Sequence, residues 1–189
     1  RQDGYFYVDK TALMYQMVKT GSYYFLSRPR RFGKSLLIST LEAYFQGKKE
    51  LFAGLMVEKL EKDWIEHPIL LDLNIEKYDV SESLDNILDK SLTAWEKLYG
   101  AEPSERSFSL RFAGIIERAY EKTGQRVVIL VDEYDKPMLQ AIGNEDLQKQ
   151  FRDTLKPFYG ALKTMDGCIK FALLTGVTKF GKVSVFSDL

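Results

Sequence analysis

One short segment, residues 23–45, restricts the possible folds of this chain more than any other. It consists of an apolar run, Tyr23-Tyr24-Phe25-Leu26, the loop Ser27-Arg28-Pro29-Arg30-Arg31-Phe32-Gly33-Lys34-Ser35, and an amphipathic run from Leu36 to Phe45. This order predicts a strand over 23–27, a tight loop, and a helix over 34–46. The unpaired N–H groups and the dipole at the start of such a helix attract anions. The segment therefore predicts a site for phosphate groups.

The triplet Gly33-Lys34-Ser35 carries the chemistry of this loop. Lys34 would reach the β and γ oxygens of a nucleotide, and the Ser35 hydroxyl would bind Mg²⁺. The general pattern G-x-x-x-x-G-K-[ST] has glycine where this chain has Arg28. Because Pro29 biases Arg28 toward extended backbone, we expect an altered loop entrance and an ordinary glycine-lysine-serine cradle. The alternative is a helix start that carries a basic residue by chance.

Strand and helix patterns alternate along the rest of the chain. Apolar runs predict strands at 69–74, 127–131 and 169–174, with a short strand or turn at 183–186. Helices are expected from near Asp9, as N-cap, to near Gly21, then at 82–99 and 108–122, and from 145 to a stop or kink at Pro157. The apolar stripe of the first helix would contain Leu13, Met17 and Val18. The alternation predicts an α/β fold of three layers, an open and mostly parallel sheet between helices.

Composition limits the remaining possibilities. A chain of 189 residues allows one domain, 1–189, and its apolar share of 45% suits a globular protein. The formal net charge is zero, so no general basic excess favours constitutive nucleic-acid binding. The single cysteine, Cys168, excludes an internal disulfide. With no membrane span or signal peptide in the pattern, we expect a cytoplasmic location.

Three predicted strands end in polar residues that suit one reaction. The first leads to Lys34 and Ser35, the strand 127–131 leads to Asp132 and Glu133, and the last leads to Thr175. In an open parallel sheet, ligands bind beyond the carboxyl ends of the strands. Asp132 would hold Mg²⁺ with the Ser35 hydroxyl, and Glu133 would orient or deprotonate the attacking water. Thr175 could bond that water or the γ-phosphate.

Each of these residues also has a structural interpretation. Asp132 and Glu133 could cap the next turn, and Thr175 could be an ordinary strand residue. Asp135 is better explained as the N-cap of a short helix than as a catalytic group. The side chains of Arg30 and Arg31 could clamp phosphate, bind an acidic partner or remain solvated. We expect structural roles for Asp72, His67 and Cys168.

Four motifs along the chain carry a resemblance to a known family. They are Tyr7-Val8-Asp9-Lys10-Thr11, Arg28-Pro29-Arg30-Arg31-Phe32-Gly33-Lys34-Ser35, Asp132-Glu133-Tyr134-Asp135-Lys136-Pro137, and Thr175-Gly176-Val177-Thr178-Lys179-Phe180. Together they resemble the AAA-ATPase-like family of prokaryotic P-loop ATPases over nearly the whole chain. The usual loop of that family also begins with arginine, so Arg28 departs from the general pattern but not from the family.

The resemblance implies a P-loop NTPase fold of the additional-strand, catalytic-glutamate type. The strand that ends at Thr175 would lie between the phosphate-loop strand and the strand before Asp132. A fifth strand and any lid would lie beyond Leu189, and many relatives carry a C-terminal PD-(D/E)xK nuclease-like domain. Since the chain lacks an initial methionine and stops after an apolar pattern, we expect a C-terminally truncated fragment of a longer protein.

The resemblance also assigns roles by position. Asp132 is the acid of the metal site together with Ser35, Glu133 is the catalytic base, and Thr175 is the sensor, with Lys34 on the phosphates. The nucleotide-binding set is Arg30, Arg31, Phe32, Gly33, Lys34 and Ser35. The arginine finger stays open, with Arg106, Arg111, Arg118 and Arg152 as candidates. The motif at 7–11 suits an N-capped helix better than an adenine contact.

These observations predict an ATP-binding domain that hydrolyses ATP with Mg²⁺ and acts as a switch or motor for a C-terminal domain or a partner. A GTPase is disfavoured, because the segment Thr178-Lys179-Phe180-Gly181 lacks the aspartate that pairs with guanine. A small-molecule kinase would need an acceptor site that the sequence does not define. The alternative from another class is a non-hydrolysing module that binds nucleotide or nucleic acid through a degenerate loop. A homo-oligomer is also possible.

Overall fold

A parallel four-stranded sheet forms the centre of the molecule. The computed structural model describes residues 8–71 and 84–177. The strands are β1 (Tyr23–Ser27), β2 (Ile69–Leu71), β3 (Val127–Val131) and β4 (Ile169–Gly176), in the order β1-β4-β3-β2. All neighbouring pairs are parallel. The expected position of the Thr175 strand, between the phosphate-loop strand and the strand before Asp132, is confirmed.

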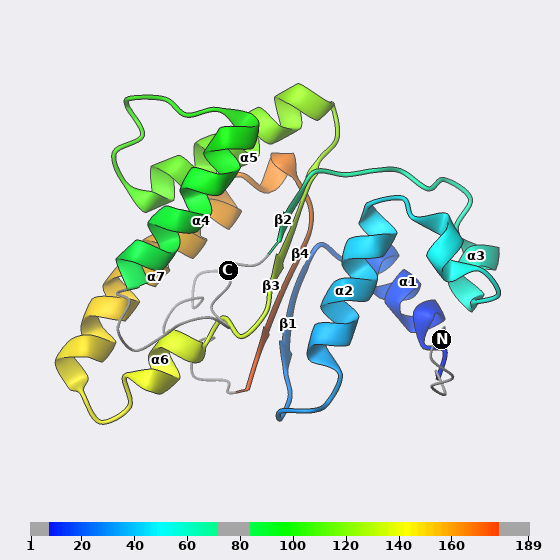
Figure 1. Ribbon diagram of the computed structural model, residues 1–189, viewed down its shortest axis with the longest axis horizontal. Coiled ribbons are helices and arrows are strands. Elements are labelled where there is room, and N and C mark those ends of the chain that lie inside the picture. The colour runs from blue at the N-terminus through cyan, green and yellow to red at the C-terminus, as the bar shows by residue number, and fades with distance from the viewer. Residues whose placement is uncertain (1–7, 72–83, 178–189) are drawn as a thin grey trace.

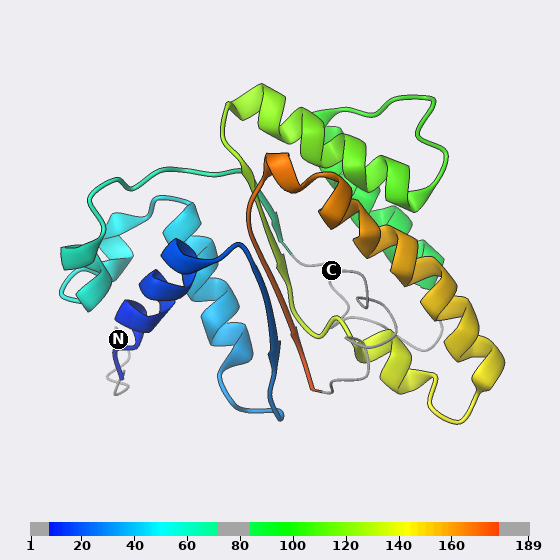
Figure 2. The ribbon, with the colours of Figure 1, turned by 180° about the vertical axis from the view of Figure 1, so that it is seen from behind.

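Helices cover both faces of this sheet, which gives the expected three layers (Figures 1 and 2). On one face lie α1 (Thr11–Thr20), α2 (Lys34–Phe45), α3 (Met56–Leu60) and the 3₁₀ turn η1 (Lys49–Phe52). On the other lie α4 (Leu84–Tyr99), α5 (Phe108–Thr123), α6 (Lys136–Gln140), α7 (Glu145–Thr164) and the 3₁₀ turn η3 (Asp166–Cys168). In the described ranges, no helix combines the length and the apolar character that crossing a bilayer would require.

The strand β3 is buried along its whole length because both of its faces carry core side chains. Val127, Ile129 and Val131 belong to the core under α4, α5 and α7. Val128 and Leu130 belong to the second core, under α1 and α2. Successive side chains of a strand point to opposite faces, so a continuous apolar run is what a strand between two helical layers requires.

Two helices differ from the sequence prediction. In α7, Pro157 does not stop the helix, which continues to Thr164, and the alternative of a kink there stays a prediction. Its ring lies on the exposed side, while Phe151, Leu155 and Phe158 hold the other side in the core. The stripe of α1 is also rotated: Met14 and Val18 are buried, and Leu13 is 66% exposed. Asp72 and the predicted strand at 183–186 lie outside the described residues.

Asp9 and Thr11, two residues of the first quoted motif, join two helices, a role that the sequence did not indicate. Lys10, and not Asp9, occupies the N-cap position of α1. The Asp9 carboxylate accepts hydrogen bonds from the N–H and hydroxyl of Thr11 at 2.9 and 2.7 Å, and from the N–H of Met56 at 2.8 Å. The Thr11 hydroxyl accepts from the N–H of Val57 at 3.1 Å. These bonds satisfy N–H groups at the first turns of α1 and α3.

Candidate functional site

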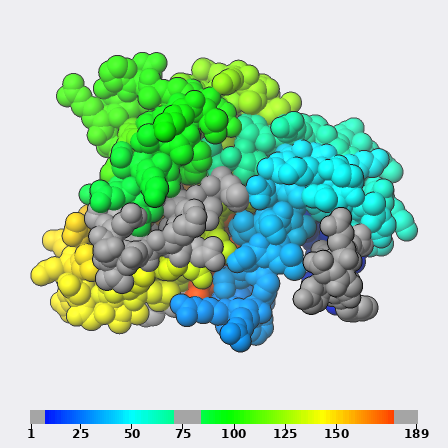
Figure 3. All heavy atoms as spheres, viewed as in Figure 1, coloured from blue at the N-terminus to red at the C-terminus, as the bar shows by residue number. Residues whose placement is uncertain are grey.

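The sequence-predicted site residues lie at the carboxyl ends of β1, β3 and β4. Since the strands are parallel, Lys34 and Ser35 after β1, Asp132 and Glu133 after β3, and Thr175 in β4 reach the same edge of the sheet. In the space-filling view, the red end of β4 appears at the surface between the blue loop before α2 and the yellow atoms that follow β3 (Figure 3). Helices that follow β1 and β3 leave on opposite faces of the sheet, and such a divergence creates a crevice.

The loop before α2 turns at a different residue from that of the general phosphate-loop pattern. Gly33 is left-handed, with φ 75°, and so is Arg31, with φ 66°. Arg28 is not left-handed, and its N–H donates to the carbonyl of Gly176 at 3.1 Å. The missing glycine is therefore explained: Arg28 prolongs the pairing of β1 with β4, and the left-handed turn is made three residues later. Arg28 thus has an ordinary backbone conformation, as expected for a residue before proline.

The side chain of Lys34 is folded into its own loop. Lys34 is 6% exposed, and its ammonium donates to the carbonyls of Arg28 and Pro29 at 2.9 and 3.0 Å. It therefore lies at the carboxyl edge of the sheet, where the prediction placed it. The two carbonyls are the acceptors of its ammonium among the described residues.

A hydrogen-bonded cluster around Asp132 joins the three strand ends. Its carboxylate accepts from the hydroxyl of Ser35 at 2.6 Å, from the hydroxyl of Thr175, and from the N–H of Glu133 at 3.1 Å. Thr175 is fully buried. A carboxylate and a hydroxyl side by side are hard oxygen ligands of the kind that Mg²⁺ accepts with water and phosphate completing its shell. The residues thus fit the predicted ion.

The backbone of Glu133 is strained. Its φ is 52°, and among the described residues only Arg31 is another non-glycine residue with positive φ. Such conformations cost about 1–3 kcal/mol each and concentrate at functional sites. The Glu133 carboxylate lies 3.4 Å from the ammonium of Lys136. Lys136 belongs to the quoted motif, but no local signal had indicated that it would face Glu133.

Asp135 stands at the N-cap position of α6, as predicted, but its side chain makes no capping bond there. It is instead 1% exposed and accepts the N–H of Val177 at 2.9 Å, which ties the start of α6 to the end of β4. Gly176 makes room for this contact, because a Cβ atom there would lie 2.7 Å from the ring of Tyr134 and 2.8 Å from the Asp135 carboxyl. Burial raises the pKa of Tyr134 to about 12.

Several candidates are not brought into this cluster. Arg30, Arg31 and Phe32 are exposed on the loop surface. Two of the arginine-finger candidates are engaged between α4 and α5: Arg111 is paired with Asp89 and Glu96, and Arg118 is paired with Glu105. These ion pairs inside the helical layer give both arginines a structural role. Arg106 is exposed in the loop before α5, and Arg152 lies on α7.

His67 bonds to the backbone, and the Cys168 thiol is partly buried. The His67 ring nitrogen Nδ1 donates to the carbonyl of Arg126 at 2.8 Å, and burial lowers the pKa of this imidazole. Burial raises the pKa of the Cys168 thiol, which disfavours the reactive thiolate. No group of three or more potential metal ligands among histidine, cysteine, aspartate and glutamate occurs in the described part of the chain.

An apolar hollow of about 380 Å³ lies beside the loop. Phe32 and Gly33 form its loop side, Leu36 and Leu37 belong to α2, and Met14 belongs to α1. Phe32 is 68% exposed and Leu36 is 58% exposed, so both side chains present apolar surface at the hollow. The sequence had presented these residues as parts of a loop and a helix face, and the fold brings α1, the loop and α2 together around the hollow.

The parallel sheet, the two helical layers and the loop between β1 and α2 form an α/β structure that is compatible with a P-loop-like fold. A family model described as "Predicted AAA-ATPase" matches residues 1–186, and the chain belongs to this family. It is also 41% identical over 189 residues to an "Uncharacterized protein in vnfD 5'region" of Azotobacter chroococcum mcd 1. The match covers 99% of this chain and 36% of that protein. No solved structure matched the chain.

Proposed function

We propose that this chain binds ATP with Mg²⁺ and hydrolyses it at the carboxyl edge of the sheet. One observation carries the proposal: Ser35, from the loop after β1, shares a hydrogen-bonded cluster with Asp132 after β3 and Thr175 of β4. A hydroxyl and a carboxylate beside a helix start with an enclosed lysine form the set that holds a metal-bound triphosphate. Membership of a family described as "Predicted AAA-ATPase" supports the same reaction.

Each residue of the set would have a distinct task. Lys34 would exchange the carbonyls of Arg28 and Pro29 for β- and γ-phosphate oxygens. Mg²⁺, with Ser35 and Asp132 among its ligands, would supply charge neutralisation at the phosphates. Glu133 would orient or deprotonate the attacking water once released from Lys136.

Thr175 and the exposed loop residues would act around this centre. The buried Thr175 hydroxyl would fix the orientation of Asp132. This arrangement favours a positioning task for Thr175 ahead of a direct contact with water. Arg30 and Arg31 lie on the outer side of the loop, where their guanidinium groups would add positive charge close to the phosphates.

The apolar hollow beside Gly33 supports a nucleoside as the other half of the ligand. It shares Phe32 and Gly33 with the loop that would hold the phosphates. A base bound against Phe32 and Leu36 would cover apolar side chains that are now exposed. This placement predicts binding of the whole nucleotide in preference to free phosphate.

Two substitutions separate binding from hydrolysis. Lys34→Ala should abolish binding of Mg-ATP in a calorimetric titration, with Lys90→Ala, an exposed lysine of α4, as the matched control. Glu133→Gln should keep binding and lose turnover, since the amide cannot accept a proton. Its control is Glu121→Gln, an exposed position of α5. Equal turnover by Glu133→Gln and the unchanged chain would refute the catalytic assignment, and binding by Lys34→Ala would refute the site.

The activity of the longer protein forms a separate proposal. The chain spans 36% of the Azotobacter relative. In a longer protein, hydrolysis of ATP to ADP and phosphate at this site would be coupled to motion of a further domain, for which the resemblance suggests a nuclease-like one. Turnover by the 189-residue chain should then be slower than turnover by the longer protein. Equal rates under saturating ATP would contradict such coupling.

A further inference from the structure

A second pocket, of about 400 Å³, lies at the amino ends of the strands, opposite the candidate ATP site. His67, Arg126 and Lys170 line it from the starts of β2, β3 and β4. Lys19, at the end of α1, and Glu61, after α3, line the other side. A pocket of this volume suits a small organic ligand. Nothing in the proposed ATPase reaction uses it.

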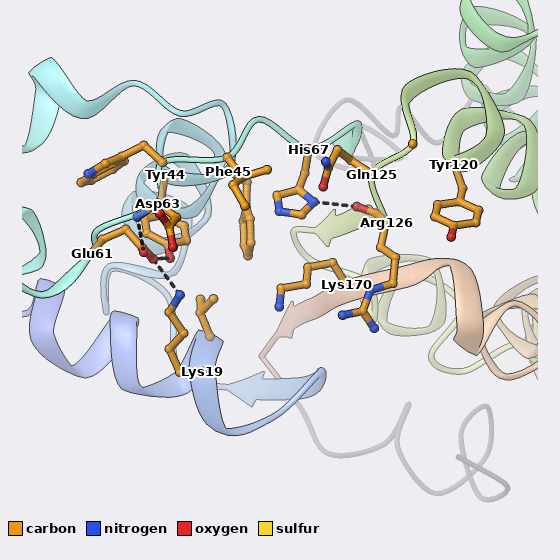
Figure 4. Close-up of a pocket in the computed structure, with 14 residues that line it drawn as sticks. Lys19, Tyr44, Phe45, Glu61, Asp63, His67, Tyr120, Gln125, Arg126 and Lys170 are labelled. Carbon is orange, nitrogen blue, oxygen red and sulfur yellow. Dashed lines mark hydrogen bonds and ion pairs between the residues drawn. The ribbon is translucent and has the colours of Figure 1, made fainter.

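Lys170 enters this pocket because β4 contains an irregularity. Val127 and Val128 of β3 pair with Ile169 and Phe171 of β4, so Lys170 is the extra residue of a bulge. It is the one charged side chain in the strand. Bulges redirect a side chain and are frequent next to functional sites. Here the bulge directs an ammonium group into the pocket, where Figure 4 shows it below the His67 ring.

The charged residues of the pocket form two groups: a balanced side, where Lys19 faces carboxylates, and an unbalanced side, which contains Arg126 and Lys170. On the balanced side, the Glu61 carboxylate lies 2.9 Å from the ammonium of Lys19 and also accepts a hydrogen bond from the Tyr44 hydroxyl. The negative charge of Asp63 also helps to raise the pKa of Lys19, and Figure 4 shows both carboxylates on the Lys19 side of the pocket.

On the unbalanced side, neither Arg126 nor Lys170 forms an ion pair with any residue that the structure describes. Burial lowers the pKa of Lys170, and the positive charges of Arg126 and Lys19 lower it further, against a smaller opposite effect of Glu61. His67 donates from Nδ1 to the carbonyl of Arg126, and its lowered pKa favours the neutral ring. Two cations thus face one pocket with no anion between them.

We infer that this pocket binds a phosphate-bearing small molecule, with its phosphate group between Arg126 and Lys170. A phosphate monoester carries about two negative charges at neutral pH, which matches two unpaired cations. The guanidinium of Arg126 suits the planar, paired contacts that phosphate oxygens accept. Ile65 and Tyr120 also line the pocket, and as exposed side chains they offer apolar surface to the organic part of the ligand.

The single histidine of the chain allows a direct test, because His67 gives one set of imidazole signals in a proton–carbon NMR spectrum. The titration uses inorganic phosphate and then phenyl phosphate, at constant ionic strength. It is done in Lys34→Ala, so that the ATP site does not contribute. We expect saturable shifts of the His67 signals, with phenyl phosphate binding more tightly than inorganic phosphate. Unsaturable shifts that sodium chloride reproduces would overturn the inference.

Lys170→Met, added to the same background, should weaken phosphate binding by about tenfold or more, as expected for losing a hydrogen bond to a charged group. Lys90→Met is the matched control and should leave the affinity unchanged. Equal affinity in the two variants would exclude the site. If Lys170→Met does not fold, Arg126→Gln replaces it with the same expected loss.

The thermal midpoint of Lys170→Met without ligand gives a second readout. It should equal or exceed that of the parent, because an unpaired, half-buried charge is removed. A lower midpoint would mean that the ammonium is already satisfied within the protein, and it would count against the site. This result does not depend on whether the chain hydrolyses ATP.

Discussion

The Ser35 hydroxyl donates a hydrogen bond of 2.6 Å to Asp132, although 97 residues separate them in the chain. The contact joins the start of α2 to the end of β3 across the central strand β4. It places a hydroxyl and a carboxylate together where hard cations find suitable oxygen ligands. The candidate site therefore depends on the arrangement of the sheet as much as on the loop.

Asp132→Asn should remove most of the effect of Mg²⁺ on nucleotide binding. The amide lacks the charge that attracts the ion, so the strengthening of ATP binding by Mg²⁺ should fall by about tenfold or more, the value of one strong charged contact. Titrations of the protein with ATP, in the presence of Mg²⁺ and in the presence of EDTA, measure this difference in affinity. Asp153→Asn, at an exposed position of α7, should keep the full Mg²⁺ effect. The same dependence in both variants would place the metal elsewhere.

Gly176→Ala should destabilise the protein, because the new methyl group would collide with the Tyr134 ring and the Asp135 carboxyl. Overpacking of this kind costs about 1–3 kcal/mol. Gly160→Ala is a control with the opposite expected sign: it lies inside α7 with no atom within 4 Å of an added Cβ. Alanine there should raise stability by up to about 1 kcal/mol. Urea unfolding of both variants measures the difference, and a stabilised Gly176→Ala would contradict the packing described.

Arg118→Ala should lower stability and leave the ATP turnover of the folded protein unchanged. The guanidinium forms two bonds to Glu105, of 2.5 and 3.0 Å, and holds the pKa of that carboxyl below its ordinary value. Leaving Glu105 unpaired in a mostly buried place should cost about 2–3 kcal/mol. The double variant with Glu105→Ala should recover part of the loss, as chemical denaturation can show. A loss of turnover at full stability would instead make Arg118 an arginine finger.

A fall in pH should lower the free energy of unfolding, in part because Glu61 becomes protonated. Burial alone would raise the pKa of this carboxyl, but hydrogen bonds from Tyr44 and Lys19 outweigh burial and lower it below the ordinary value of 4.5. The unfolded chain then binds the proton more tightly, so this contribution to stability is present above the ordinary pKa and disappears as the pH falls through the folded-state pKa.

Glu61→Gln should therefore show a flatter decline of the unfolding free energy below about pH 5 than the parent chain. Glu66→Gln, an exposed position in the same segment, is the control and should decline like the parent. Parallel curves for Glu61→Gln and the parent would show that the carboxyl is not coupled to folding.

The convergence of Lys34, Asp132 and Thr175 could be predicted because it follows from two local patterns. Apolar runs mark parallel strands, and the residues after such strands meet at one edge. The order of the strands could not be obtained this way and rested on the family resemblance. Periodicity indicates which side of an element is buried, but it does not say which element covers it.

The remaining features depend on contacts between distant segments. The left-handed conformation that the general pattern would place at position 28 occurs at Arg31 instead. The N–H of Arg28 donates a hydrogen bond to the carbonyl of Gly176. Leu13 is exposed although the apolar pattern predicted its burial, and α7 continues past Pro157 although proline disfavours a helix interior. In both cases, packing against the rest of the protein outweighs the local sequence preference. Lys170 looked like an ordinary strand residue until the register of β4 against β3 showed that it is the extra residue of a bulge.

The strand β4, which lies between β1 and β3, is the last of the described strands to be synthesised. Within the described residues, β1 pairs only with β4, and the bond between Ser27 and Val177 spans 150 residues. Until β4 is added, the segment with Lys34 and the segment with Asp132 have no strand in common. Such long-range closure is slow and leaves apolar strand edges uncovered in the growing chain. A ribosome-bound chain that ends before β4 should therefore require protection from aggregation, and the two halves of the site should come together only when the sheet is completed.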